Sequence, residues 1–205
     1  MRRQRTISIL RQSCRGGRAG CNYFQYAGNT PATTVAFTLI ELIIVISIII
    51  VLASLILATS GYVAKKGRRS RADAEIAAMS AALESYKADN GIYPRSSETD
   101  SLDPTSTNPT SYQAASLKLY EFLSGDSNDD RTTDTKSYFA FKPNQLNPSD
   151  ATKSVTSLRD PFGHPYGYST MKASDPMKNG FNPTFDLWSA ADDTAGSQNK
   201  WIKNW

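Results

Sequence analysis

The sequence predicts an α+β fold in which one long N-terminal helix packs on a small antiparallel sheet. Three observations predict it: an uncharged apolar run from Leu42 to Thr59, an amphipathic pattern that extends this run to Asn90, and short strand-like segments near the C-terminus. A helix followed by strands favours helices packed on one side of an antiparallel sheet. The residues beyond Pro94 are numerous enough for one modest core.

The apolar run is the first half of the expected helix. It holds 18 residues without a charge, mostly Ile, Leu and Val. At 1.5 Å per residue its length approaches the ~30 Å hydrocarbon thickness of a bilayer. We therefore expect a transmembrane helix over residues 37–60, continuous because no Pro interrupts it. Glu41 stands at its start, where an ionised carboxylate at bilayer depth costs ~2.5–3.5 kcal/mol, so Glu41 needs a cation.

The second half of the helix is amphipathic. Its apolar residues recur at steps of four and three, which is one face of an α-helix: Ala72, Ile76, Met79, Leu83 and Tyr86. Gly91 follows Asn90 and is a stop signal, because Gly tolerates the left-handed conformation past a helix end. The pattern predicts one helix from about Phe37 to Asp89, with residues 61–93 as its amphipathic continuation.

Residues 94–205 are expected to form a globular α+β domain with a loop-rich C-terminal region. Residues 95–111 are rich in Ser, Thr, Pro and Asp and predict a loop. A short helix is expected around Leu117 to Leu123, followed by an acidic loop over 124–136. Alternation and flanking turn residues predict three short strands: Ser137–Lys142, Tyr166–Ser169 and Phe185–Ser189.

Residues 1–36 have the composition of a basic leader that is removed on processing. They carry six Arg and no acidic residue, and the apolar run that follows exceeds the 7–15 residues of a conventional secretory signal. Both cysteines, Cys14 and Cys21, lie in this leader, so a chain cut after it has no disulfide. Without the leader, 17 basic residues stand against 19 acidic ones. The net charge of +4 therefore does not indicate a nucleic-acid-binding surface, and we expect no nucleic-acid partner.

The residues A-FTLIE, from Ala36 to Glu41, resemble the processing site of type IV prepilins and of the pseudopilins of type II secretion. In that family a dedicated peptidase cuts before the Phe and methylates the new amino terminus, which implies a cut between Ala36 and Phe37. The residue before the cut is usually Gly and is Ala36 here. The resemblance also implies that Glu41 pairs with the terminal amine of a neighbouring subunit during assembly. The alternative for Glu41 is a carboxylate at the headgroup level of an ordinary signal anchor.

Two further segments resemble major pseudopilins. The long helix ends in Y-x-x-D-N-G-x-Y-P, here Tyr86 to Pro94, as in that family. The segment Asp160 to Tyr166, DPFGHPY, resembles D-P-W-G-N-P-Y, and its two Pro and one Gly predict a turn before a strand. His164 is the only histidine of the protein, so no second imidazole supports a metal or catalytic site there.

The segment Phe185 to Asp193, FDLWSAADD, resembles F-D-x-W-S-x-G-A-D, which in major pseudopilins leads into a calcium-binding loop. The resemblance implies Asp193 as a carboxylate ligand of calcium and the Ala190 carbonyl as a backbone ligand. Calcium takes six to eight oxygens, however, and the tail GSQNKWIKNW lacks the family's further acidic residues. The alternative is a loop held by the packing of Trp188, Trp201 and Trp205 on the sheet.

A basic cluster follows the apolar run: Lys65, Lys66, Arg68, Arg69 and Arg71. Because the leader on the other side of the run is also basic, charge alone leaves the topology open. Three interpretations stay open for the cluster: contact with anionic headgroups, contact with acidic groups of a neighbouring subunit, or a solvated helix segment.

The resemblance implies a structural subunit of an inner-membrane-anchored filament, and most closely the major pseudopilin of a type II secretion-like system. Its expected partners are further copies of itself, the prepilin peptidase, the inner-membrane secretion and assembly platform and minor pseudopilins. It implies a single membrane pass with the C-terminal domain in the periplasm. The sequence carries no G-x-S-x-G, P-loop or paired metal-ligand spacing, so we expect no enzyme.

Two alternatives to this function are kept. One is a type IV pilin for adhesion, motility or DNA uptake, although the disulfide-bounded loop of many such pilins is missing here. The other is a membrane-anchored extracytoplasmic binding module or enzyme that uses a pilin-like anchor only.

Overall fold

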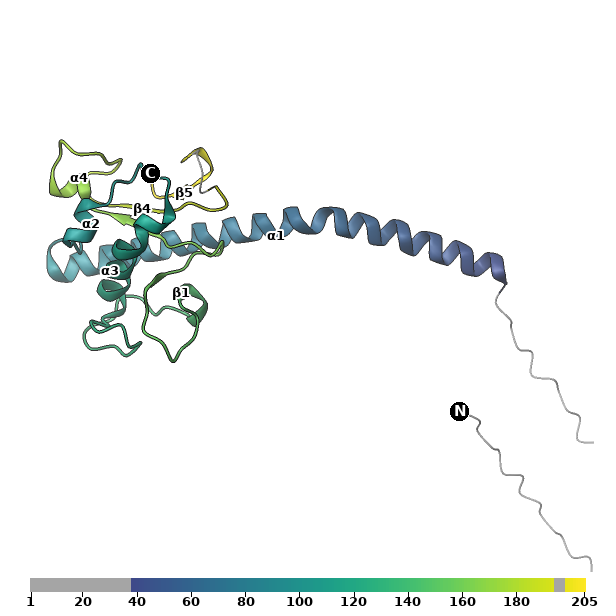
Figure 1. The fold of residues 1–205 in the computed structure, drawn as a ribbon, viewed down its shortest axis with the longest axis horizontal. Coiled ribbons are helices and arrows are strands. Elements are labelled where there is room, and N and C mark those ends of the chain that lie inside the picture. The colour runs from purple at the N-terminus through teal and green to yellow at the C-terminus, as the bar shows by residue number, and fades with distance from the viewer. Residues whose placement is uncertain (1–37, 194–197) are drawn as a thin grey trace, which may run out of the picture. The chain divides into compact units, whose positions relative to one another are not determined.

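The computed structural model describes residues 38–193 and 198–205 (Figure 1). The predicted cut between Ala36 and Phe37 lies outside the described residues. The described chain divides into two units, one that ends at Ser47 and one that begins at Ile48, and each is described by itself.

The long helix is confirmed as α1, which runs unbroken over Leu39–Asn90. Every large apolar side chain from Leu39 to Leu57 is 46–76% exposed, whichever way it points from the helix. Among the described residues, α1 is the one helix long and apolar enough to cross a membrane, judged by length and composition. A helix that is apolar on all sides needs a cover of lipid or protein, because in water its surface is unfavourable.

The amphipathic half of α1 supplies one wall of the core. Its buried residues are Ala72, Ile76, Met79, Ala82 and Leu83. Four of the five predicted positions are therefore buried, and the fifth, Tyr86, is half-buried. Gly91 has a φ of 79°, and its N–H donates to the Lys87 carbonyl at 2.7 Å. This left-handed glycine is the predicted stop of the helix.

The helix expected around Leu117 to Leu123 is confirmed as α3, which spans Gln113–Ser124 and ends at Gly125 with a φ of 74°. The loop that follows it, over residues 125–136, contains no helix or strand, as predicted. A four-residue helix, α4, spans Met171–Ser174. Three 3-10 turns complete the helical elements: η1 Pro109–Tyr112, η2 Pro143–Gln145 and η3 Gln198–Lys200.

The prediction of a loop over 95–111 is wrong in part, because α2 spans Ser97–Ser101 and η1 begins at Pro109. A reciprocal cap starts α2: the Ser96 hydroxyl accepts from the Thr99 N–H at 3.4 Å, and the Thr99 hydroxyl accepts from the Ser96 N–H at 2.9 Å. The usual form of this cap has Glu or Gln in the place of Thr99, so the sequence signal is weak.

Two small antiparallel sheets accompany the helices. One pairs β1 (Leu146–Asn147) with β2 (Ser157–Leu158). The other has the order β3-β4-β5, with β3 at Gly167–Ser169, β4 at Asp186–Ser189 and β5 at Ile202–Lys203. The strands expected near Tyr166–Ser169 and Phe185–Ser189 are thus confirmed as β3 and β4. The fold is α+β with a pilin-like layout, as the sequence predicts.

The predicted strand Ser137–Lys142 is wrong, because no strand forms there. The backbone N–H groups of Tyr138 and Phe139 both donate to the carbonyl of Leu123 at the end of α3, at 2.8 and 2.9 Å. These two N–H groups therefore bond to the end of a helix, and this segment has no neighbouring strand with which to form a β-ladder. The aromatic side chains that suggested a strand are instead partly buried against the core.

Two apolar clusters make up the core of residues 48–205. The larger joins the buried stripe of α1 to α3 and to residues of β3 and β4 such as Tyr168 and Leu187. The smaller surrounds Trp188, on the same strand as Leu187. Strand β4, buried along its whole length, therefore faces both clusters.

Gly167 makes the close approach of β3 and β4 possible. It pairs directly with Trp188, and a Cβ at Gly167 would lie 2.1 Å from the indole. We expect Gly167→Ala to lower the free energy of unfolding by ~1–3 kcal/mol, because the buried ring must shift. Urea unfolding of the full chain in detergent, followed by near-UV circular dichroism, measures this loss.

The matched control is Gly67→Ala in α1, where an added Cβ meets nothing within 4 Å. There the change is expected to be neutral or to stabilise the helix by up to ~1 kcal/mol. Equal stability of the two variants would contradict this account of the packing between β3 and β4.

Candidate functional site

The first candidate site is the start of α1. The Thr38 hydroxyl oxygen accepts from the Glu41 backbone N–H at 3.3 Å, and its O–H lies 3.4 Å from Glu41 Oε2. Thr38 thus caps the helix, with Glu41 at the third helical position. A carboxylate there is favoured by the partial positive charge of a helix N-terminus. Glu41 forms no salt bridge with any described residue.

The second candidate site is the C-terminal loop, whose described residues are 190–193 and 198–201. The Ala190 carbonyl, one predicted calcium ligand, accepts from the Asp193 N–H at 3.1 Å. The Asp193 carboxylate, the other, lies 3.2 Å from the ammonium of Lys200. The Asp193 carbonyl accepts from the indole N–H of Trp201 at 3.2 Å. The two predicted ligands lie close together, and each has a partner from the protein.

The donor set of the described loop does not fit calcium. A calcium ion needs six to eight oxygens, several of them anionic, and Lys200 puts a positive charge beside Asp193. Residues 38–193 and 198–205 contain no group of three or more His, Cys, Asp or Glu placed to hold a metal. Calcium binding stays a prediction of the resemblance.

Ala191 occupies the place where the resembling segment carries Gly. Its φ of 53° lies in the left-handed region, which costs a residue with a Cβ roughly 1–2 kcal/mol. The Ala191 N–H donates to the Ser189 hydroxyl at 3.0 Å, and Ala191 itself is buried. The backbone therefore turns at Ala191 in a conformation that its Cβ disfavours.

Aromatic packing surrounds the loop, as the alternative to calcium predicts. Trp188 and Trp201 are 0% and 4% exposed, and their rings stack with centroids 6.1 Å apart and planes at 4°. Tyr112 meets Trp188 edge-on at 5.2 Å. Trp205 is half-buried and stacks on Phe181 at 4.4 Å. The loop thus rests on an apolar cluster.

The two resembling C-terminal segments meet at one buried carboxylate. Asp160 Oδ1 accepts from the N–H groups of Phe162 and His164 at 2.9 and 2.8 Å, which holds the predicted turn. Asp160 Oδ2 accepts from the Ser189 hydroxyl at 2.5 Å, which ties this turn to β4. His164 takes part through its backbone, because its N–H donates to Asp160 and its carbonyl accepts from the Asp160 N–H, so the predicted turn is confirmed.

Contacts between α1 and the C-terminal loop were missed by sequence reasoning. Lys65 forms an ion pair with Asp192, and the ammonium, acting chiefly through its hydrogen bond, holds the pKa of that carboxyl below its ordinary value. The Arg69 guanidinium donates to the Lys200 carbonyl at 2.7 Å. The two residues of each pair are more than 120 positions apart in the sequence, so no local sequence pattern predicts their contact.

Glu75 forms a second link between α1 and the rest of the domain. Its carboxylate accepts from Arg71 Nε at 2.8 Å and from the Tyr166 hydroxyl at 2.6 Å. Burial, reinforced by this carboxylate, raises the pKa of Tyr166, so the hydroxyl stays a donor at every physiological pH. Glu75 therefore ties the basic cluster to the segment that leads into β3.

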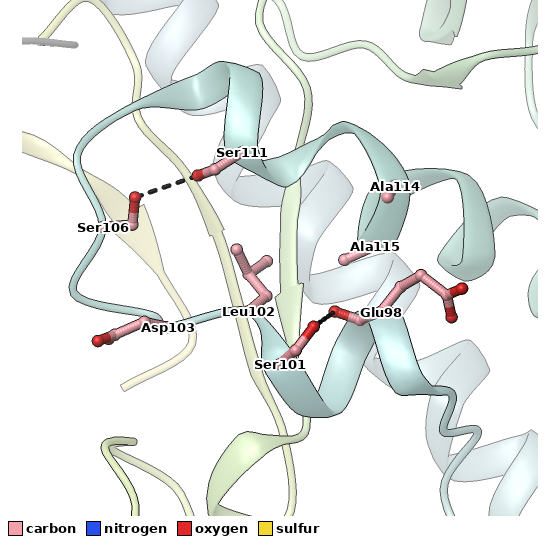
Figure 2. A pocket seen from close by; sticks show the side chains of 8 residues that line it. All are labelled: Glu98, Ser101, Leu102, Asp103, Ser106, Ser111, Ala114 and Ala115. Carbon is pink, nitrogen blue, oxygen red and sulfur yellow. Dashed lines mark hydrogen bonds between the residues drawn. The ribbon is translucent and has the colours of Figure 1, made fainter.

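A shallow hollow of about 340 Å³ lies between α2 and α3 (Figure 2). Its floor is Leu102 with Ala115, and Glu98 and Asp103 stand at its rim. The Asp103 carboxylate already accepts from Thr105 and from Asn179 at 2.8 and 2.9 Å. The lining holds no histidine, lysine or cysteine. The hollow is a gap in the packing of two short helices.

The chain matches no protein-family model, no curated protein and no solved structure in our comparisons.

We expect the C-terminal loop to depend on Trp201 and to respond little to calcium. Trp201→Ala removes a buried, stacked indole and should lower the free energy of unfolding by ~3–5 kcal/mol. Thermal unfolding of the full chain in detergent, with physiological calcium or with chelator, should give nearly the same melting temperature.

The comparison variant is Asp193→Ala, which removes the predicted carboxylate ligand. Calcium at a hundredfold excess over its dissociation constant would stabilise the native state by ~2.7 kcal/mol. A shift of that size, lost in Asp193→Ala and kept in Trp201→Ala, would show that calcium holds the loop.

Proposed function

We propose that this protein is the structural subunit of an inner-membrane-anchored filament that polymerises through α1, and that it acts as the major pseudopilin of a type II secretion-like system. In this proposal residues 37–60 cross the membrane once and the C-terminal domain lies in the periplasm. The observation that carries it lies at the start of α1. The helix is apolar and exposed on all sides, Thr38 caps its N-terminus, and its first turn contains one carboxylate, that of Glu41.

An anchor alone would account for the apolar side chains of α1 but not for Glu41. A carboxylate at bilayer depth costs ~2.5–3.5 kcal/mol, and a simple anchor functions better without it. In an assembled filament the apolar halves of neighbouring helices cover one another, and Glu41 then needs a cation from another copy.

Processing supplies that cation. A cut before Phe37 creates a new α-amino group, which can carry a positive charge and can therefore pair with the carboxylate of Glu41. The cap described above holds Glu41 in the first turn of the helix, close in sequence to the new terminus. Amine and carboxylate of two copies can then neutralise each other in an apolar surrounding.

Secretion rather than adhesion or DNA uptake is favoured by the C-terminal domain. The DPFGHPY and FDLWS segments that resemble major pseudopilins join through Asp160 and Ser189 into one buried unit. No cysteine occurs after Cys21, so the mature chain has no disulfide-bounded loop. The proposal implies the prepilin peptidase, an inner-membrane assembly platform and minor pseudopilins as partners, and no catalytic activity of the chain itself.

Glu41→Gln tests the pairing, because glutamine keeps the size and hydrogen-bonding ability of the side chain and removes only its charge. We expect the variant to be inserted and processed like the natural protein and to form no filaments. Leaving one charge buried without the other costs on the order of 3–5 kcal/mol per contact. Filament yield, measured by shearing and electron microscopy in a host with the assembly machinery, reports the outcome.

The matched control is Glu84→Gln, an exposed glutamate on the amphipathic half of the same helix. It should assemble normally. Normal filaments from Glu41→Gln, or loss of filaments in both variants, would reject the assembly role assigned to Glu41.

A further inference from the structure

A positively charged hollow lies where the C-terminal tail crosses α1. Its volume is about 460 Å³, and Lys66, Arg69, Ser70 and Asp73 line it from the helix. The tail contributes Lys203, with Trp201 on the same side. The lining therefore contains three cationic side chains, one carboxylate, that of Asp73, and one hydroxyl, that of Ser70.

Several cations of this region already have partners. Lys65 pairs with Asp192, Arg71 with Glu75, and the Arg69 guanidinium donates to the Lys200 carbonyl. Among the described residues, Lys66 and Arg68 form no salt bridge or side-chain hydrogen bond.

Lys203 likewise forms no salt bridge with a described residue. Its ammonium lies over the rings of Trp205 and Phe181, at 4.9 and 5.6 Å from their centroids. This contact holds the ammonium in place without neutralising it. Lys66, Arg68 and Lys203 therefore have no anionic partner among the described residues, and neither has Arg69, whose partner is a neutral carbonyl. We call these four residues the juxtamembrane cations.

The position of Lys66 along α1 indicates which anion it meets. The apolar run ends at Thr59, and Lys66 follows seven residues later, or about 10 Å along the helix axis. The headgroup layer extends about 5–7 Å beyond the hydrocarbon on each side of a bilayer. Helical side chains tilt toward the N-terminus, so the extended Lys66 side chain reaches back into that layer. Tyr62, which is 71% exposed, lies between Thr59 and Lys66 on the helix, where a tyrosine is typical of the membrane–water interface.

We propose that the juxtamembrane cations and the hollow beside them bind the phosphate headgroup of an anionic phospholipid. The inference rests on the membrane span of the proposed function and adds a lipid preference to it. Each lysine or arginine near a charged membrane surface contributes about 1 kcal/mol of attraction. The tail that carries Lys203 thus has a role beside its packing: it brings a third cation to the hollow that Lys66 and Arg69 line.

The test uses the full chain, reconstituted into vesicles of phosphatidylcholine with or without phosphatidylglycerol. Flotation shows whether the chain is inserted. Electron spin resonance of spin-labelled lipids then compares how strongly the protein immobilises phosphatidylglycerol and phosphatidylcholine. We expect insertion into both kinds of vesicle and a severalfold preference for phosphatidylglycerol at low salt, which high salt abolishes.

Lys66→Gln and Lys203→Gln are each expected to lower the preference, by up to roughly fivefold per cation. The control Lys153→Gln changes an exposed lysine far from this segment in the sequence and should have no effect. Insertion without a lipid preference, or a preference unchanged in both test variants, overturns the inference and leaves the membrane span intact. Failure to insert into either kind of vesicle overturns the span itself.

One more outcome separates lipid from a second copy of the chain. If Lys66→Gln blocks filament formation while the preference for phosphatidylglycerol is unchanged, the cation serves an acidic group on a neighbouring subunit, and the lipid inference is rejected.

Discussion

The central constraint on this molecule is that the first half of α1 is apolar on every side and receives no cover from the described residues. The apolar side chains of the domain after Asn90 cover α1 from Ala72 onward, and the contacts before Ala72 are the polar ones of Lys65 and Arg69. The earlier side chains, 46–76% exposed, therefore need lipid or other copies of the helix. Under the proposed function, membrane insertion and polymerisation satisfy this requirement one after the other, and the proposal relies on Glu41 to distinguish a filament subunit from a plain anchor.

The C-terminal domain shows how apolar packing can replace charge in a loop. The tail carries Trp201 and two lysines where the resembling family has acidic residues. The structure buries Trp201 against Trp188 and places Lys200 beside Asp193. Stacked rings and an ion pair thus hold the segments that flank residues 194–197. The ion pair of Lys65 with Asp192 joins this loop to α1 just beyond the apolar run.

The sequence predicts the elements that carry strong local periodicity or punctuation. The bounds of α1, the buried stripe, the stop at Gly91 and the strands β3 and β4 follow from spacing and turn residues. Elements that depend on partners distant in the chain were not predicted: β1, β2 and β5 are two residues long, and each exists only because another strand lies beside it. The segment Ser137–Lys142 shows the opposite error, because it has the pattern of a strand but lies beside a helix end. Glu41 and Asp193 were predicted as site residues by resemblance, whereas the contacts of Lys65 with Asp192, of Arg69 with the Lys200 carbonyl and of Lys200 with Asp193 required the fold.

The central claim, that α1 is the assembly helix of a processed filament subunit, is tested most directly by the intact mass of the protein extracted from membranes of a host that contains the prepilin peptidase. The account predicts a mature chain that begins at Phe37 and carries one methyl group on its amine. A chain that still begins at Met1, or one cut near Leu57 so that the apolar run is lost, would contradict it.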